Sequence, residues 1–216
     1  MRAMDLVSAT EWSEPPPGPR ARKGTIDVWR GAVGQDRARE MLLDVLGRYT
    51  EREPSELLIE QGTGGKPRLA GAHGGAPGAG DVRFNLSHSE DVTLVAVSKG
   101  REVGIDVEAI GRGRGGQIDE VAIARRMLEP EQAERLERMD GMERRIEFLR
   151  AWTRYEARVK CLGIGIGGAR ARAQGAELWT AEVEAGAGAI AAVAVQGSER
   201  CELRCWEWSA ASRASR

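Results

Sequence analysis

The segment Val103-Gly-Ile-Asp-Val-Glu108 alternates apolar and acidic residues, as a β-strand between core and solvent does. Successive side chains of a strand point to opposite faces, so Asp106 and Glu108 would project together while Ile105 and Val107 enter a core. Two neighbouring carboxylates repel each other unless a charge compensates them. Mg²⁺ would do so, because it commonly binds one or two protein carboxylates together with water and phosphate. An edge strand protected by exposed charge shows the same pattern, so the pair alone leaves both interpretations open.

The elements around this strand predict an α+β fold. Helical periodicity marks residues 35–49, 119–127, 131–139 and 144–162, and strand patterns mark residues 25–29, 57–60, 82–86, 93–97 and three pieces within 178–208. These elements do not alternate in a regular βαβ rhythm, which favours α+β over α/β. Residues 1–23 are rich in Pro, Glu and Arg and predict a disordered leader. Loops are expected at 62–68, 70–80 and 112–116, where glycines gather.

Composition narrows the class of protein. The 216 residues carry a formal net charge of −1, which gives no general attraction to nucleic acid or to a membrane surface. No run of 18 apolar residues and no secretory signal pattern occurs, so no membrane association is expected. The three cysteines are odd in number and do not have the spacing of a zinc site. These features predict a cytoplasmic protein with reduced thiols.

A second group of candidate residues lies on the helix that contains Trp152-Thr-Arg-Tyr-Glu-Ala-Arg-Val-Lys160. Trp152, Glu156 and Lys160 are spaced four residues apart and therefore share one stripe of the helix. A surface Glu–Lys pair beneath a core tryptophan would account for this stripe equally well. The glycine-rich run 163–168 ends the helix, and because it follows a helix and not a strand it does not predict a dinucleotide-binding loop.

Two further segments suit an anionic ligand. In Phe84-Asn-Leu-Ser-His-Ser89, His88 follows a strand within a turn rich in Ser and Asn, which would offer hydroxyls, an imidazole and backbone N–H groups. A serine hydrolase is disfavoured, because the chain has no Gly-x-Ser-x-Gly elbow. Gly65-Lys-Pro-Arg68 places two cations at a restricted turn, which suits a phosphate group but also an ordinary basic loop.

The order and spacing of these four motifs resemble the 4′-phosphopantetheinyl transferase superfamily in its longer, monomeric form, over about residues 26–168. The resemblance implies transfer of phosphopantetheine from coenzyme A to a serine of an apo acyl, peptidyl or aryl carrier protein. Mg²⁺ would be the cofactor and adenosine 3′,5′-bisphosphate the product. Such activation serves fatty acid, polyketide or nonribosomal peptide biosynthesis.

The resemblance also implies an architecture. Two similar halves, each a small antiparallel sheet packed with helices, would be related by a pseudo-twofold, with the active site in the cleft between them. The halves would span residues 24–99, which clasp coenzyme A, and 100–208, which hold the metal and catalytic residues, before a disordered tail at 209–216.

Residue roles follow from the same resemblance. Asp106, Glu108 and Glu156 would bind Mg²⁺, and Asp106, Glu156 and Lys160 would be the catalytic residues. Glu156 would take the proton of the carrier serine, and Lys160 would neutralise charge on the pyrophosphate. The residues expected to contact coenzyme A are Lys66, Pro67, Arg68, Asn85, Ser87, His88 and Lys160: Ser87 and His88 on the phosphates, Asn85 shaping their turn, and Lys66–Arg68 at the adenosine 3′-phosphate end.

The chain also departs from the family pattern. Tyr155 stands where the family usually has a lysine, so one cation near the phosphates is missing unless Arg154 or Arg158 replaces it. The region between Trp29 and Gln35 is short, which leaves Arg37 and Arg39 as the replacements for basic contacts to coenzyme A. The alternative function is therefore a degenerate family member that binds carrier protein or coenzyme A without efficient turnover.

Overall fold

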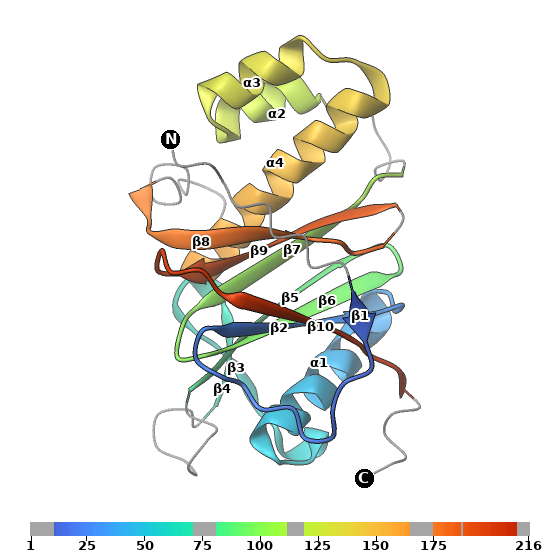
Figure 1. Ribbon diagram of the computed structural model, residues 1–216, viewed down its shortest axis with the longest axis vertical. Coiled ribbons are helices and arrows are strands. Elements are labelled where there is room, and N and C mark those ends of the chain that lie inside the picture. Colours follow the sequence, from blue (N-terminus) through green and yellow to red (C-terminus); the bar gives the residue numbers. More distant parts are fainter. Residues whose placement is uncertain (1–10, 71–80, 112–118, 165–174, 187, 211–216) are drawn as a thin grey trace.

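A computed structural model describes residues 11–70, 81–111, 119–164, 175–186 and 188–210. Its strands form two main sheets, with one helix against each sheet and two short helices at one end of the molecule (Figure 1). The predicted α+β class is confirmed. The expected loops at 71–80, 112–116 and 165–168 lie outside the described residues. Within those residues, no helix has both the length and the apolar character needed to cross a bilayer.

The larger sheet has five strands in the order β1-β10-β2-β6-β5. β2 (Thr25–Gly31) pairs antiparallel with β6 (Val92–Lys99), and β6 pairs antiparallel with β5 (Val82–Ser89). On the other side of β2 the pairing is parallel, to β10 (Glu202–Glu207) and then to β1 (Trp12–Ser13). The sheet is therefore mixed, whereas an antiparallel sheet was expected. The amphipathic helix α1 (Gln35–Thr50) buries Met41, Val45 and Leu46 against one face of this sheet.

The smaller sheet has the order β7-β9-β8 and is antiparallel throughout. Its strands are β7 (Val103–Ala109), β9 (Ala189–Gln196) and β8 (Leu178–Val183). Ile105 and Val107 enter a core shared with Ile26 and Val28 of the larger sheet, as the alternation predicted. On the opposite face lies the long helix α4 (Gly141–Leu162), which packs through small residues such as Ala157 and Cys161.

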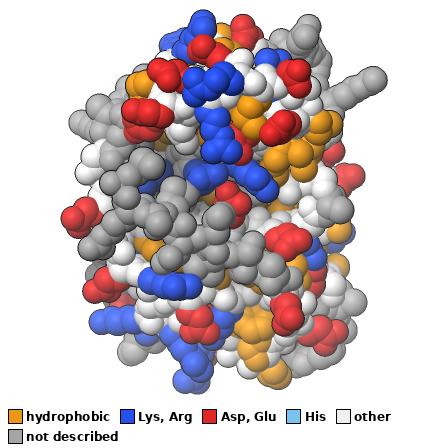
Figure 2. All heavy atoms as spheres, turned by 45° about the horizontal axis from the view of Figure 1, so that its top comes forward, with side chains coloured by type: hydrophobic (Ala, Val, Ile, Leu, Met, Phe, Trp, Pro, Cys, Tyr) orange, Lys and Arg blue, Asp and Glu red, His pale blue; other side chains and the backbone are white. Residues whose placement is uncertain are grey.

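The far end of α4 supports a small helical unit (Figure 1). α2 (Glu120–Met127) and α3 (Pro130–Glu137) are separated at Pro130, which occupies the first turn of α3. Their apolar faces pack on Phe148, Leu149 and Tyr155 of α4. Figure 2 shows Lys and Arg side chains interleaved with acidic ones on this end. Several are ion-paired, as Arg125 is with Glu137 and Arg145 is with Glu120.

Three expectations about chain organisation need correction. Residues 12–13 are not a disordered leader but pair with β10, and the Trp12 indole donates a hydrogen bond to the Glu184 carbonyl; residues 1–10 lie outside the described residues. β10 was expected in the C-terminal half, yet it is an inner strand of the other sheet. The segment 62–68 is not only loop, since η2 (Thr63–Gly65) leads into β4 (Pro67–Leu69), which pairs with β3 (Ile59–Gln61) after the short turn η1 (Pro54–Glu56). The pseudo-twofold relation stays a prediction.

Candidate active site

The contact between β7 and α4 brings the acidic residues of the strand to the helix. At its centre is Gly104, where a Cβ would stand 2.1 Å from the Ala157 carbonyl oxygen and 2.3 Å from the Cys161 nitrogen. No residue larger than glycine fits between these two backbones. The close approach places Asp106, two residues along the strand, beside Lys160 on the helix.

Asp106 is the central acceptor of this contact. Its Oδ1 accepts a hydrogen bond from the Lys160 ammonium at 2.7 Å and another from the Ser87 hydroxyl at 3.0 Å. Lys160 also donates to the Ser87 oxygen at 2.9 Å. The residue is only 5% exposed, and burial raises the pKa of its carboxyl although Lys160 opposes that shift. Asp106, Lys160 and Ser87 thus form one buried polar cluster drawn from β7, α4 and β5.

The other two predicted acids lie around this cluster. Glu156 is buried on α4, and burial together with the negative charges of Asp106 and Glu108 raises its pKa to about 7. Glu108 is half-buried at the end of β7, and burial and Asp106 raise its pKa as well, against a hydrogen bond from Trp152. The three carboxyls are close enough to repel one another. Lys160 opposes this repulsion at all three, and Arg145 also opposes it at Glu108.

Two oxygens of this group test whether a metal ion fits. Within the described residues, Asp106 Oδ2 and Glu156 Oε1 are buried and have no hydrogen-bond partner. A buried carboxylate oxygen without a partner is costly unless a cation or donor reaches it. Hard divalent ions prefer such oxygens. No three His, Cys, Asp or Glu side chains of the described chain are already assembled at metal-binding spacing, however. The oxygen chemistry of Asp106, Glu108 and Glu156 fits a divalent ion.

The segment Phe84–Ser89 does not form the expected turn. It belongs to β5, and its alternate polar side chains bond to the backbone of β7: Asn85 Oδ1 accepts from Ile105 N at 2.9 Å, Ser87 Oγ from Val107 N at 3.4 Å and Ser89 Oγ from Ala109 N at 3.0 Å. These bonds join the edge strands of the two sheets through side chains. Asn85 therefore holds the sheets together, and Ser87 contributes to the Asp106 cluster.

His88 and Ser87 point to opposite faces of β5, because they are adjacent in a strand. Ser87 faces β7, whereas His88 is half-buried on the side of Phe84, whose ring packs in the core beneath α1. The two residues thus do not form a single phosphate-binding turn. A ligand that contacts both must cross the edge of β5.

Lys66, Pro67 and Arg68 line a pocket of about 310 Å³, as do Arg83 of β5 and the C-terminal end of α4. The wall of the pocket has three basic side chains and one acidic one, Glu102, and this excess of positive charge suits an anionic ligand. Lys66 itself is only 12% exposed and is bonded to Glu102, whereas Arg68 is 48% exposed and pairs with the equally exposed Glu60. Arg83 pairs with Glu102 at 3.0 Å.

Tyr155 stands where the family usually has a lysine, and neither it nor the two arginines considered as replacements for that lysine lie beside Asp106. Tyr155 is 7% exposed and packs with Trp152 in the core under α2 and α3. Arg154 forms an ion pair with Glu182 of β8 at 3.0 Å, and Arg158 donates to the Ala176 carbonyl at 3.2 Å. Neither arginine replaces a cation beside Asp106.

Arg37 and Arg39 are both exposed on α1. Arg37 pairs with Glu40 and lies over the Trp208 ring. A contact from either arginine to coenzyme A stays a prediction.

Sequence reasoning missed three contributors to the site. Gly104 appeared only as part of a motif, although a glycine inside a strand pattern is itself a signal for close approach of another backbone. Glu102 and Arg83 were not singled out, because their pairing with each other and with Lys66 joins residues far apart in the chain. No local pattern marks such a triad.

Comparison with known proteins finds similarity over the part of the chain that contains this site. A model of the 4′-phosphopantetheinyl transferase superfamily matches residues 102–207, which include β7, α4 and the acidic cluster. Over this half of its length the chain is similar to the 4′-phosphopantetheinyl transferase superfamily. The 4′-phosphopantetheinyl transferase HetI of Nostoc sp. is 33% identical over 128 residues, which are 59% of this chain and 51% of the relative.

Other phosphopantetheinyl transferases match this chain more weakly. A putative 4′-phosphopantetheinyl transferase of Synechocystis sp. is 29% identical over 57% of this chain and 47% of its own length. The L-aminoadipate-semialdehyde dehydrogenase-phosphopantetheinyl transferase of Xenopus laevis is 25% identical over 70% of this chain and 50% of its own. The chain thus spans about half the length of the curated relatives it matches.

Proposed function

We propose that this chain transfers 4′-phosphopantetheine from coenzyme A to a serine of an apo carrier protein, in a reaction that depends on Mg²⁺. The observation that carries the proposal is the pair of buried, unpartnered oxygens, Asp106 Oδ2 and Glu156 Oε1, beside the Lys160 ammonium in the described structure. Similarity to the 4′-phosphopantetheinyl transferase superfamily supports the reaction type, and the pocket beside α4, with three basic side chains on its wall, supports an anionic substrate.

The reaction exchanges one oxygen for another on phosphorus. The carrier serine oxygen bonds to the phosphorus that bears pantetheine, and the bond from that phosphorus to the bridging oxygen breaks. Adenosine 3′,5′-bisphosphate leaves with the electron pair, and the serine proton passes to the Glu156 carboxylate. Lys160 holds Asp106 in place and offers positive charge to the phosphates. A bound Mg²⁺, held by Asp106, Glu108 and Glu156, would supply further positive charge on the pyrophosphate oxygens.

The decisive experiment incubates the protein with coenzyme A, Mg²⁺ and several apo carrier domains and weighs each carrier by mass spectrometry. We expect one carrier to gain the mass of a single phosphopantetheine. If no carrier gains this mass while coenzyme A still binds by calorimetry, the alternative of a degenerate binding protein is correct. If neither transfer nor binding occurs, the proposed function is wrong.

The site assignment is tested by Asp106→Asn and Glu156→Gln, which keep the shape of each side chain. We expect each to lower the transfer rate about 100-fold, as loss of a proton acceptor or charge partner typically does. Both should also weaken binding of Mn²⁺, measured by its electron paramagnetic resonance signal without substrates. Glu143→Gln, an exposed glutamate in the first turn of α4, is the matched control and should change neither quantity. Rates like the wild type in either site variant would reject the assignment.

A further inference from the structure

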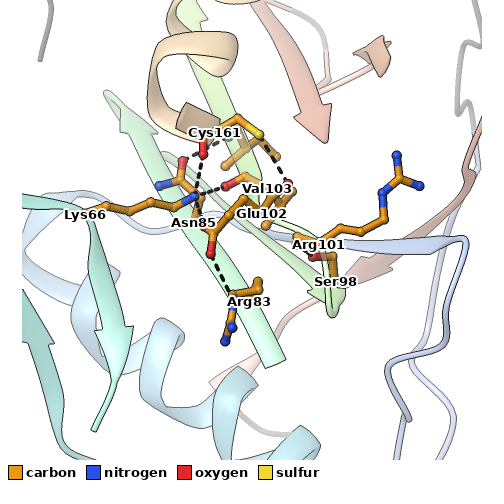
Figure 3. A network of polar contacts seen from close by, with 9 residues as sticks. Lys66, Arg83, Asn85, Ser98, Arg101, Glu102, Val103 and Cys161 are labelled. Atoms are coloured by element: carbon orange, nitrogen blue, oxygen red, sulfur yellow. Dashed lines mark hydrogen bonds and ion pairs between the residues drawn. The ribbon is translucent and has the colours of Figure 1, made fainter. Parts of the chain in front are cut away.

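Lys66 connects its own segment to two others, the start of β7 and the end of α4 (Figure 3). Its ammonium donates to the Glu102 carboxylate at 2.5 Å, to the Val103 carbonyl at 2.9 Å and to the Cys161 carbonyl at 3.0 Å. A lysine ammonium has three donors, so this set uses its hydrogen-bonding capacity in full. Its side chain is 12% exposed, which separates it from the exposed arginine two positions along the same segment.

The Cys161 carbonyl is one of the carbonyls that the end of a helix leaves without an intrahelical donor. α4 ends at Leu162, and the following backbone N–H groups of Gly163 and Ile164 bond to the carbonyls of Lys160 and Val159. The Cys161 carbonyl is instead met by Lys66. A cation at this position also complements the negative end of the helix dipole. Lys66 thus caps α4 from a segment almost a hundred residues earlier in the chain.

The same ammonium fastens the beginning of β7. Val103 is the first residue of that strand, and the neighbouring Glu102 is held on its other oxygen by Arg83 at 3.0 Å. Asp106 follows three residues later and receives Lys160, which is the direct neighbour of Cys161 on α4. Two lysines therefore bond across the α4–β7 contact. Lys160 of α4 bonds to Asp106 of β7, and Lys66 bonds to both the start of β7 and the end of α4.

The backbone around Lys66 is fitted to this contact. Gly64 has a φ of +68°, and a Cβ there would lie 1.6 Å from the Gly163 carbonyl oxygen. The turn before Lys66 therefore rests directly on the C-terminal cap of α4. An ammonium that left for a ligand would abandon this cap and leave the Glu102 charge to Arg83 alone.

We propose that Lys66 is a positioning residue, which sets Lys160 against Asp106 by fixing the end of α4 to the start of β7, and that it does not clasp the adenosine 3′-phosphate. This proposal rests on the proposed function for its catalytic consequence. The cation of this segment that can reach a phosphate is Arg68, because its exposed ion pair with Glu60 is weak and easily exchanged.

Steady-state kinetics distinguish the two roles of Lys66. We expect Lys66→Met to lower kcat about tenfold or more, equally with coenzyme A and with 3′-dephospho-coenzyme A, and to change KM for either by less than about threefold. Lys66→Arg should not restore kcat, because a planar guanidinium does not fit three acceptors arranged around an ammonium. The matched variant Arg68→Met should instead raise KM for coenzyme A with little change for the dephosphorylated form.

A phosphate clasp would behave in the opposite way. Lys66→Met would then raise KM for coenzyme A alone, and Lys66→Arg would restore it, since arginine binds phosphate well. Either result would overturn the proposal.

A double-mutant cycle measured by urea unfolding tests, without any substrate, whether Lys66 joins α4 to β7. Lys66→Met and Glu102→Gln should each lower the unfolding midpoint, and the double variant should lose clearly less than the sum. The matched cycle on Arg68 and Glu60 should be additive, with small losses. Additive losses at Lys66 and Glu102 would overturn the proposal. If the wild type modifies no carrier, the proposed function fails, and this cycle alone decides whether Lys66 joins α4 to β7.

Discussion

Tyr155 and Glu156 are neighbours on α4, yet they lie in different environments. One step along an α-helix turns the side chain by about 100°. Glu156 therefore faces the acidic cluster, whereas Tyr155 enters the core under α2 and α3, with its ring centroid 5.8 Å from that of Trp152. The tyrosine belongs to the packing of the helical unit, and it does not face the acidic cluster.

We expect Tyr155→Lys to destabilise the protein by about 3–5 kcal/mol, because it removes a buried aromatic ring and places an ammonium in an apolar cluster. Urea unfolding followed by tryptophan fluorescence measures this loss. Tyr155→Phe is the control and should lose about 1 kcal/mol, since the ring remains and only the hydroxyl is removed. A Tyr155→Lys variant with unchanged stability and faster transfer would show that this position does reach the substrate.

Some residues of the site could be predicted from the sequence, and others could not. Asp106 and Glu108 followed from strand alternation, and Glu156 and Lys160 from spacing of four on a helix, because both rules act over a few residues. The roles of Lys66 and Asn85 could not be predicted in this way. Their bonds span 95 and 20 residues, so only the tertiary fold brings the partners together.

At the scale of elements, the packing of α4 on β7 determines the geometry of the site. The helix lies so close to the strand at Gly104 that backbone meets backbone. α4 also packs closely on the adjacent strand β9, where Ala192 and Ala194 have small side chains. This contact carries Asp106 on one element and Lys160 on the other, so their separation depends on the absence of a side chain at position 104.

We expect Gly104→Ala to cost about 3 kcal/mol of stability, because the new methyl group would overlap backbone atoms that cannot rotate away. The remaining folded protein should transfer about 100-fold more slowly, since a shift of about 1 Å at a site has effects of that size. Thermal unfolding and transfer rates measure the two effects. Gly175→Ala is the control, because a Cβ there meets nothing within 4 Å, and it should change both quantities little. Normal behaviour of Gly104→Ala would mean that the two elements can separate without loss.

Most elements could be predicted from periodicity, but the extent of β5 could not. Asn85, Ser87 and Ser89 are residue types that favour turns, so the strand appeared to end at Leu86. In the fold these side chains serve as acceptors for the β7 backbone, which replaces the usual ladder between two edge strands. These polar residues fit a strand because β7 lies beside β5, and the local sequence of β5 does not indicate that neighbour.

At the scale of the whole molecule, the two ends of the chain are interlocked. β10 lies between β1 and β2, so the C-terminal strand completes the sheet of the N-terminal half. The alternation in residues 201–208 predicted a strand but not its partner, since nothing local indicates a pairing with residues 25–30. The predicted boundary between residues 99 and 100 therefore separates β10 from the other strands of its own sheet.

Besides the backbone pairing, a buried carboxylate, Asp27 of β2, holds β10 in place. It accepts two hydrogen bonds from the Arg204 guanidinium at 2.6 and 2.8 Å, one from the Trp206 indole at 3.1 Å and one from the Tyr49 hydroxyl at 2.7 Å. Burial and the Asp27 charge raise the pKa of Tyr49, which keeps its hydroxyl protonated as a donor. These bonds join β10 and α1 to the same residue of β2.

We expect Arg204→Met to lower the free energy of unfolding by about 3–5 kcal/mol, because it leaves the Asp27 charge buried without its cation. Urea unfolding measures the loss. Arg125→Met, which breaks the exposed pair with Glu137, is the matched control and should cost less than about 1 kcal/mol.

The folded fraction of Arg204→Met should keep its kcat, because Arg204 has no contact with the acidic cluster. A loss no greater than that of the control would show that β10 is held by its backbone ladder alone. A lowered kcat in the folded fraction would instead mean that this sheet transmits strain to β7 through the side chains of β5.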